Sequence, residues 1–255
     1  MGLPGLTTSQ MIEVDRIMVE DLDIHLELMM EHAGLNFARL ALEFFDPYSR
    51  IFRIIAGSGN NGGGGLVAAR KLSGWGYETE VVIPRGKNSL REIPKLQLSR
   101  AENTGATLID DLEVQTPEGT RIVLDSYLGY GFKSRNDEIS EAVFAYLRAE
   151  SNVVSLDIPS GLDSTTGESY SQLKPLVTMS LAFVKTGLLH SPTSHVGELL
   201  VADIGVPKDV FLSKLNLSWD PPASTKELDL LYTAFAENPI QRVNAWKPYW
   251  SMYKR

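Results

Sequence analysis

Residues 50–65, RIFRIIAGSGNNGGGG, join a short apolar run to a stretch that is rich in glycine. The apolar run ends at Gly57 and predicts a buried strand, because strands covered on both faces read as continuous hydrophobic runs. A helical pattern follows at residues 66–75. Gly57, Gly59 and Gly62 fit the spacing G-x-G-x-x-G, which is typical of the strand-to-helix turn of a dinucleotide-binding fold. Two asparagines and four consecutive glycines are more than such a turn requires, so this spacing alone is a weak signal.

Apolar runs of strand length alternate with helical patterns along most of the chain. Strands are expected at residues 50–57, 79–84, 104–110, 121–125, 152–157, 176–183 and 197–203. Helices are expected at residues 8–45 in two segments, 66–75, 90–103 and 137–149. This alternation predicts an α/β fold, in which a mostly parallel sheet lies between two layers of helices and N-terminal helices precede it.

The composition of the 255-residue chain is that of an ordinary globular protein, with 43% apolar and 22% charged residues. A net charge of −8 argues against general binding of nucleic acid. The absence of cysteine excludes disulfides, thiolate nucleophiles and thiolate metal ligands. No apolar run is long enough to span a membrane, and the N-terminus lacks the pattern of a secretion signal, so we expect a cytoplasmic protein.

Two aspartates close predicted strands: Asp125 ends RIVLD and Asp157 ends NVVSLD. In an open parallel sheet, ligands bind at the carboxyl ends of the strands. A buried carboxylate is costly unless it is hydrogen-bonded, paired or bound to a cation, so each aspartate either caps a helix or belongs to a site. Two of them beside a glycine-rich turn favour the site. Asn61, Asp125 and Ser160 offer only oxygen ligands, which suit a hard cation rather than zinc.

Four stretches together resemble the family of NAD(P)H-hydrate epimerases, the YjeF N-terminal domains. They are GSGNNGGGGLVAARKLSGWGYETEVVIP (57–84), VLDSYLGYGF (123–132), SLDIPSGLDSTTGE (155–168) and FVKTGLLHSPTSHVGELLVADIGVP (183–207), and the opening helices are similar too. The order of N-N-G-G before D-I-P-S-G is specific, whereas neither motif alone would suffice. The resemblance covers roughly residues 6–210, so we expect one domain over residues 1–255, whose last segment, 211–255, has no assigned role.

The resemblance implies a Rossmann-like three-layer sandwich that forms a homodimer. It implies an isomerase that interconverts the R and S forms of hydrated NADH or NADPH, a small-molecule substrate, and so repairs the nucleotide. The residues that match the family's substrate-binding positions are Asn60, Asn61, Gly62, Gly63, Gly64, Gly129, Tyr130, Gly131, Phe132, Lys133, Ser134, Arg135 and Asp157. Asn61, Asp125 and Ser160 match the family's ligands of a potassium ion, which is the cofactor expected here.

Epimerisation needs an acid–base group near the carbon that carries the hydroxyl, beside the ring nitrogen. We assign this catalytic role to Asp157. A positioned acid–base side chain typically contributes 10²–10⁴-fold to a rate. Lys185 is a second polar candidate for this catalytic role. The alternatives are that it positions a phosphate or simply lies on the surface.

The chain departs from the family pattern at Gly64, where the family typically carries aspartate in N-N-G-G-D-G. This loss of a carboxylate leaves a second reading open, namely a domain that binds a nucleotide or acts as a scaffold without catalysis. An ordinary NAD-dependent dehydrogenase is a third reading, since Glu78 and Glu80 lie about 20 residues after the glycines.

Overall fold

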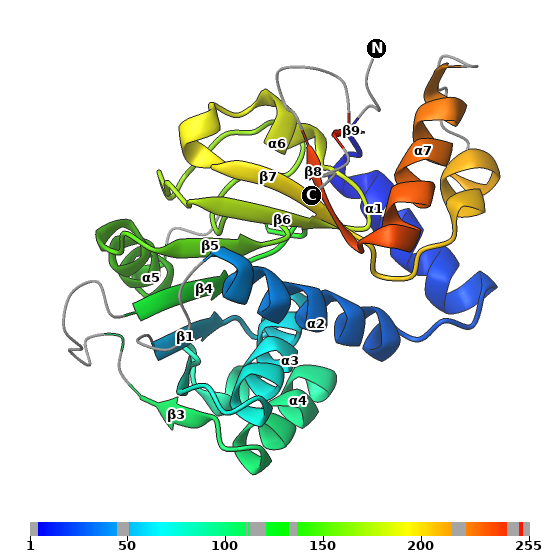
Figure 1. Cartoon of the computed structure of the whole chain (residues 1–255). Coiled ribbons are helices and arrows are strands. Elements are labelled where there is room, and N and C mark those ends of the chain that lie inside the picture. The colour runs from blue at the N-terminus through cyan, green and yellow to red at the C-terminus, as the bar shows by residue number, and fades with distance from the viewer. Residues whose placement is uncertain are drawn as a thin grey trace.

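The computed structural model describes residues 5–44, 51–110, 112, 121–132, 137–215, 223–243 and 250–251, without the side chains of 223–225 and 250–251. A sheet runs through the centre of the molecule in the order β3-β2-β1-β4-β5-β6-β7-β8-β9 (Figure 1). Its strands are β1 (Ile51–Ala56), β2 (Thr79–Val82), β3 (Thr107–Ile109), β4 (Arg121–Ser126), β5 (Val153–Leu156), β6 (Val177–Leu181), β7 (Glu198–Ala202), β8 (Ile240–Val243) and β9 (Trp250–Ser251).

Helices connect the strands and cover the sheet. They are α1 (Thr8–Arg16), α2 (Leu26–Phe44), α3 (Asn60–Gly74), α4 (Glu92–Asn103), α5 (Glu138–Ala149), α6 (Thr186–His190) and α7 (Ala223–Glu237). Short π-helical turns lie at Ile17–Asp21 and Val210–Lys214, and 3₁₀ turns at Lys87–Ser89 and Thr193–His195. None of the helices in these described segments is long and apolar enough to cross a bilayer.

The strands from β3 to β7 in the sheet order are parallel, whereas β8 is antiparallel to both of its neighbours, β7 and β9. The chain adds strands outward from β1 to β3, returns to the centre with β4, and continues in the other direction. This order reverses between β1 and β4, and ligands of doubly wound sheets bind in the crevice at such a point. The predicted α/β class, its mostly parallel sheet and its N-terminal helices are therefore confirmed.

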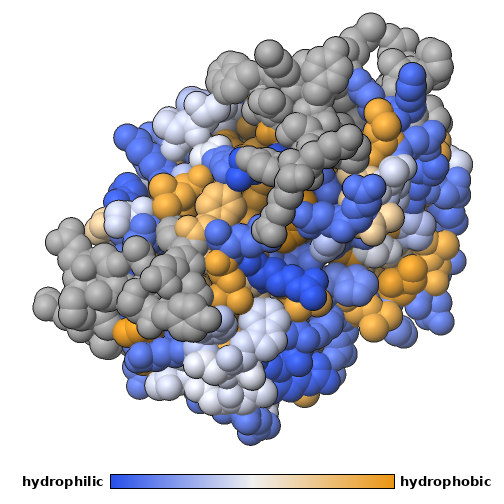
Figure 2. Space-filling model, in the orientation of Figure 1, coloured by the Kyte–Doolittle hydropathy of each residue, from blue (hydrophilic) through white to orange (hydrophobic). Residues whose placement is uncertain are grey.

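Side chains alternate between the two faces of the sheet, as the pleat of a strand requires. Ile54 and Leu124 belong to a core cluster with residues of α2, α3 and α4, while Ile55 and Val123 belong to another with residues of α5. A third cluster joins Val201 of β7 to residues of α1, α2 and α7. Helices thus cover both faces, in three layers (Figure 1). On the face shown in Figure 2, most of the described side chains are hydrophilic, and hydrophobic ones lie in separate groups among them.

Helix α3 begins at Asn60 rather than at the expected residue 66, so all four consecutive glycines lie inside it. Glycine is a poor helix former, by about 1 kcal/mol relative to alanine, and this weakened the helical pattern there. In the structure, close packing offsets the low helix propensity of these glycines. A Cβ on Gly62 would lie 1.9 Å from the carbonyl oxygen of Gly57, and one on Gly65 would lie 1.9 Å from Oγ of Ser126. The glycines therefore let α3 approach the ends of β1 and β4 closely.

The C-terminal segment, for which the sequence predicted no structure, extends the same sheet. Strand β8 pairs with β7 through residues such as Gln241 and Val201. Leu228 and Leu231 of α7 are fully buried against the cluster that contains Val201. Of the four aromatic residues clustered at the end of the chain, Trp246, Tyr249 and Tyr253 lie outside the described residues.

We expect Gly65→Ala to lower the free energy of unfolding by about 1–3 kcal/mol, since the new methyl group would overlap Ser126 and force a shift in a packed core. Gly74→Ala is the matched control in the same helix. A Cβ at Gly74 meets nothing within 4 Å, and alanine is the better helix former, so this change should raise the unfolding free energy by about 0.5–1 kcal/mol. Urea denaturation measures both, and equal effects would contradict the close approach of α3.

Candidate functional site

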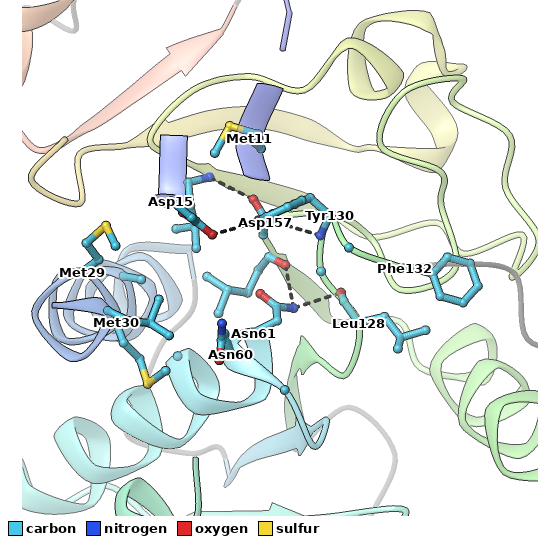
Figure 3. A pocket seen from close by; sticks show the side chains of 18 of the residues that line it. Met11, Asp15, Met29, Met30, Asn60, Asn61, Leu128, Tyr130, Phe132 and Asp157 are labelled. Atoms are coloured by element: carbon cyan, nitrogen blue, oxygen red, sulfur yellow. Dashed lines mark hydrogen bonds between the residues drawn. The ribbon is translucent and has the colours of Figure 1, made fainter. Parts of the chain in front are cut away.

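A cavity of about 430 Å³ opens at the carboxyl ends of β1, β4 and β5, where the strand order reverses (Figure 3). This volume lies in the range of small-molecule sites, roughly 300–1,000 Å³. The start of α3 and the segment after β4 form its floor, because these follow the two central strands. Helices α1 and α2 form the facing wall, which is mostly apolar and consists of Met11, Ile12, Leu26, Met29, Met30 and Ala33. The cavity therefore joins an apolar wall to a polar floor.

Asp157 lies at the end of β5, is 2% exposed, and lines the cavity. Its backbone has φ of +68°, an unusual conformation that aspartate tolerates better than most residues. One carboxylate oxygen, Oδ2, accepts a hydrogen bond from the main-chain N–H of Tyr130 at 3.0 Å. The other, Oδ1, accepts from the ammonium of Lys185 at 2.5 Å and from the N–H of Leu181 at 3.4 Å. The carboxylate is thus held by three groups, which come from the segment after β4 and the segment at the end of β6.

Lys185 is completely buried, and its ammonium also donates to the carbonyl of Leu181 at 2.7 Å. The chain must reverse between these two residues, and Ala182 with φ of +61° makes that bend. The ammonium lies 6.0 Å from the centre of the Tyr130 ring, within the range of a cation–π contact. Lys185 is therefore neither a surface lysine nor remote from Asp157, and it lines the same cavity.

Asp15 of α1 enters the cavity from the opposite wall and accepts a hydrogen bond from the hydroxyl of Tyr130. Burial raises the pKa of the Asp15 carboxyl, against the hydrogen bond from Tyr130 and the nearby Lys185, which lower it. Burial, followed by the neighbouring Asp15 carboxylate, raises the pKa of Tyr130 above its usual value, so the phenol keeps its proton. Tyr130 thus bridges two carboxyl groups, Asp157 through its N–H and Asp15 through its hydroxyl.

Asp125 lies at the end of β4 and is fully buried beneath the turn that contains Ser160. Its oxygens accept from the hydroxyl and N–H of Ser160 at 2.5 and 2.9 Å, the hydroxyl of Ser155 at 2.9 Å and the N–H of Tyr127 at 3.3 Å. Burial raises the pKa of Asp125, and these hydrogen bonds oppose the rise. Within the described part of the chain, no basic side chain pairs with this carboxylate.

The main chain of Leu128 brings Asn61 and Ser160 together. Its carbonyl accepts from the amide of Asn61 at 2.9 Å, and its N–H donates to the hydroxyl of Ser160 at 2.9 Å. Because Ser160 also contacts Asp125, the three residues predicted to hold a cation form one connected group around the end of β4. Strands β4 and β5 are neighbours, as the strand-end reasoning required. Asp157 lines the cavity, whereas Asp125 is not among its lining residues.

The predicted substrate-binding residues divide into three groups. Those that line the cavity are Asn60, Asn61, Gly64, Gly129, Tyr130, Gly131, Phe132 and Asp157. Gly62 and Gly63 are buried inside α3 and are not among its lining residues. Lys133, Ser134 and Arg135 lie outside the described residues.

Several lining residues were not predicted from the sequence, above all Asp15, Arg85 and Arg91. Asp15 did carry a signal, since it stands four residues after Met11 and next to Val14 on the buried face of an amphipathic helix, where an acidic residue is unexpected. The two arginines lie in the turn after β2 and at the start of α4, and nothing in their local sequence distinguished them from surface residues.

Comparison with known proteins finds relatives of this chain in both sequence and structure. The sequence model of the family described as YjeF-related protein N-terminus matches residues 26–187. The NAD(P)H-hydrate epimerase of Dehalogenimonas lykanthroporepellens is 36% identical over 82% of this chain and 85% of its own. That of Mycosarcoma maydis is 32% identical over 88% of this chain and 91% of its own. The crystal structure of the yeast protein ynu0 matches with a TM-score of 0.74 and 27% identity, over 84% of this chain and 94% of the other.

We expect Lys185→Met to lower the free energy of unfolding by about 3–5 kcal/mol, because it leaves the buried Asp157 carboxylate without its cation. Lys208→Met removes the same kind of group from an exposed pair with Asp229 and should change the unfolding free energy by less than about 1 kcal/mol. Chemical denaturation of the two variants beside the wild type measures the difference. Similar small losses in both would contradict the importance assigned to the buried pair.

Proposed function

Because the chain belongs to the family of YjeF-related N-terminal proteins, we propose that it is an NAD(P)H-hydrate epimerase, which interconverts the R and S forms of hydrated NADH and NADPH. The observation that carries this proposal is the Asp157 carboxylate, held at the floor of a nucleotide-sized cavity at the switch point of the sheet. A fixed carboxylate next to an apolar wall supplies what the reaction needs, namely an acid–base group beside a ring.

The chemistry takes place at the ring carbon that carries the hydroxyl, next to the ring nitrogen. Protonation of the hydroxyl lets the nitrogen lone pair form a C=N bond while the C–O bond breaks and water leaves. Water then adds to the other face of the same carbon and gives up a proton, and the electron pair returns to nitrogen. Asp157 is the catalytic residue in this proposal, because its carboxyl can exchange a proton with the hydroxyl or the water.

The remaining lining residues suit the rest of the substrate. Met11 and Met29 give an adaptable apolar surface for the ring, since methionine fills irregular spaces. Asn60 stands at the start of α3, where unpaired N–H groups and the helix dipole favour a phosphate. Arg91 lines the same end of the cavity, because its main-chain N–H donates to the carbonyl of Ser58 at 3.1 Å.

Gly64 supports one rival function, a nucleotide-binding or scaffold domain with a lapsed site. A Cβ at this position would lie 2.9 Å from Cδ2 of Leu156, so an aspartate fits only if that side chain moves. The Leu156 side chain thus lies where the family's aspartate would begin. The buried Asp157, Lys185 and Asp125 argue against the rival, because a scaffold gains nothing from costly buried charges.

A potassium ion held by Asn61, Asp125 and Ser160 is part of the proposal. The donor set fits, because it consists of oxygens, and the Asp125 carboxylate is fully buried with no basic partner among the described residues. A monovalent cation would supply the missing positive charge. When bound, it would fix the turn that carries Ser160, and so the position of Asp157 three residues earlier.

The proposal also includes a homodimer and a cytoplasmic location. Both are expected from the family resemblance and the composition. Light scattering of the purified protein measures the first, and fractionation of the source cells measures the second.

We expect the purified protein to interconvert the R and S epimers of hydrated NADH. Chromatography that separates the two epimers measures this rate. Asp157→Asn should lower this rate by roughly 10²–10⁴-fold, because an amide cannot take or give the proton. Asparagine keeps the shape of the side chain and one hydrogen-bond acceptor but leaves the buried Lys185 ammonium without its anion, so circular dichroism should accompany the assay to show that the variant is folded. Full activity in Asp157→Asn would remove that residue from the mechanism.

The same assay with Gly64→Asp separates the rival function. Fast interconversion by the wild type makes Gly64 a tolerated difference. An inactive wild type with an active Gly64→Asp variant would mean a lapsed or redirected site, and inactivity of both would favour a binding role. Oxidation of NADH by the protein would instead support a dehydrogenase.

We expect the melting temperature to be higher in potassium chloride than in choline chloride at equal ionic strength, because an ion that binds only the folded state stabilises it. Asp125→Asn should abolish this difference, since it removes the charged ligand. The measurement is independent of catalysis. Equal melting temperatures of the wild type in the two salts would refute the potassium site.

A further inference from the structure

Asp15 and Asp157 line one cavity from two different elements. Asp157 ends a strand of the sheet, whereas Asp15 belongs to α1, which covers that edge of the sheet (Figure 3). Tyr130 lies between them and donates to both carboxyl groups, through its N–H at 3.0 Å to Asp157 and through its hydroxyl to Asp15. A ligand in the cavity can therefore meet a carboxyl group from each of the two elements.

Helix α1 is fixed in its place, although it lies near the end of the chain. The N–H of Leu6 donates to the carbonyl of Val184 at 2.8 Å, and the N–H of Thr186 donates to the carbonyl of Leu6 at 2.9 Å. These two bonds flank Lys185, so the chain before α1 pairs with the residue that holds Asp157. A capping box of Thr7 and Gln10 then starts the helix. The position of Asp15 is thus tied to that of the Asp157–Lys185 pair.

The two carboxyl groups have different electrostatic surroundings. Asp157 forms a buried ion pair with the Lys185 ammonium. Asp15 has no ion pair within the described residues and receives a hydrogen bond from the neutral Tyr130. Burial raises the pKa of Asp15. Enzymes commonly place two carboxyl groups in different surroundings, so that one can act as an acid and the other as a base.

We propose that Asp15 is a second acid–base residue of the epimerase, acting on the opposite face of the substrate ring from Asp157; this rests on the proposed function. Epimerisation requires a hydroxyl to leave from one face and water to arrive at the other. A single carboxyl group on one side reaches only one of these faces, whereas the pair reaches both.

The steps balance with the groups present. Protonated Asp15 gives its proton to the hydroxyl, the C–O bond breaks, the nitrogen lone pair forms the C=N bond, and one water leaves. A second water adds to the other face and passes a proton to ionised Asp157, while the C=N pair returns to nitrogen. The proton has then moved from Asp15 to Asp157, which is the state needed for the reverse reaction.

The test is the exchange of the substrate's hydroxyl oxygen with H₂¹⁸O, measured by mass spectrometry on the separated epimers, alongside epimerisation. Asp15→Asn keeps an acceptor for the Tyr130 hydroxyl but cannot carry the proton. Its epimerisation rate should fall by roughly 10²–10⁴-fold. The epimer whose hydroxyl faces Asp157 should still exchange its oxygen, because a protonated Asp157 can give its proton to the leaving hydroxyl and take one back from the water that adds on the same face. Asp157→Asn should show the converse, with exchange confined to the other epimer.

Two variants control this result. Glu13→Gln changes a carboxylate on the same helix that pairs with Arg16 outside the cavity, and should keep the wild-type rates. Asp15→Glu keeps the carboxyl group and should retain exchange in both epimers, which also serves if Asp15→Asn is poorly folded.

Three outcomes would overturn the inference. Wild-type epimerisation in Asp15→Asn would show that Asp157 alone suffices. An equal loss of epimerisation and of exchange in both epimers would show that Asp15 only supports the fold, and so would loss of both activities in Asp15→Glu. Failure of the proposed function itself is distinct, because then the wild type would show no epimerisation at all.

Discussion

The buried ion pair between Lys185 and Asp157 is the interaction on which the arrangement of the site depends. A buried pair is tolerable only when further hydrogen bonds satisfy both partners, and here the donors and acceptors come from Tyr130 and Leu181. The pair therefore fixes the ends of β5 and β6 and the segment after β4. Since Leu6 pairs with the main chain on either side of Lys185, the same interaction determines where α1 lies. One ion pair thus fixes the floor and one wall of the cavity relative to each other.

The glycines of α3 meet a second requirement, the close approach of a helix to two strand ends. Gly57, Gly62 and Gly65 leave no room for a side chain, because each lies against main-chain atoms or Ser126. This approach places Asn61 within hydrogen-bond distance of the carbonyls of Leu128 and Leu156, at 2.9 and 3.2 Å. The poor helix propensity of the glycines is therefore offset by contacts that assemble the site.

The strands and the ends that carry Asp125 and Asp157 could be predicted from the sequence, because apolar runs closed by a polar residue depend only on local pattern. The start of α3 could not, since the reason for its glycines is a contact with strands distant in the chain. Strand β8 was missed because a short antiparallel strand with partly exposed residues has no continuous apolar run. The site was predicted where a motif was compact, as in D-I-P-S-G. Asp15 was missed because its role depends on α1 folding back over the sheet, which Leu6 and Lys185 determine together.

The charges around the cavity suggest a second interpretation of Gly64, besides the loss of a functional carboxylate. Asp15 and Asp157 line the cavity together with Lys185, Arg85 and Arg91. Lys185 and Arg85 are already paired, the latter with Asp137, whereas Arg91 forms no ion pair within the described residues. A carboxylate at position 64 would add negative charge near the start of α3, where a dinucleotide would place its phosphates. Under the proposed function, glycine at this position keeps that additional negative charge away from the phosphates. The favourable interaction that an acidic residue would make with the helix dipole is worth only about 0.3–1 kcal/mol, which is small beside repulsion of a doubly charged ligand at short range.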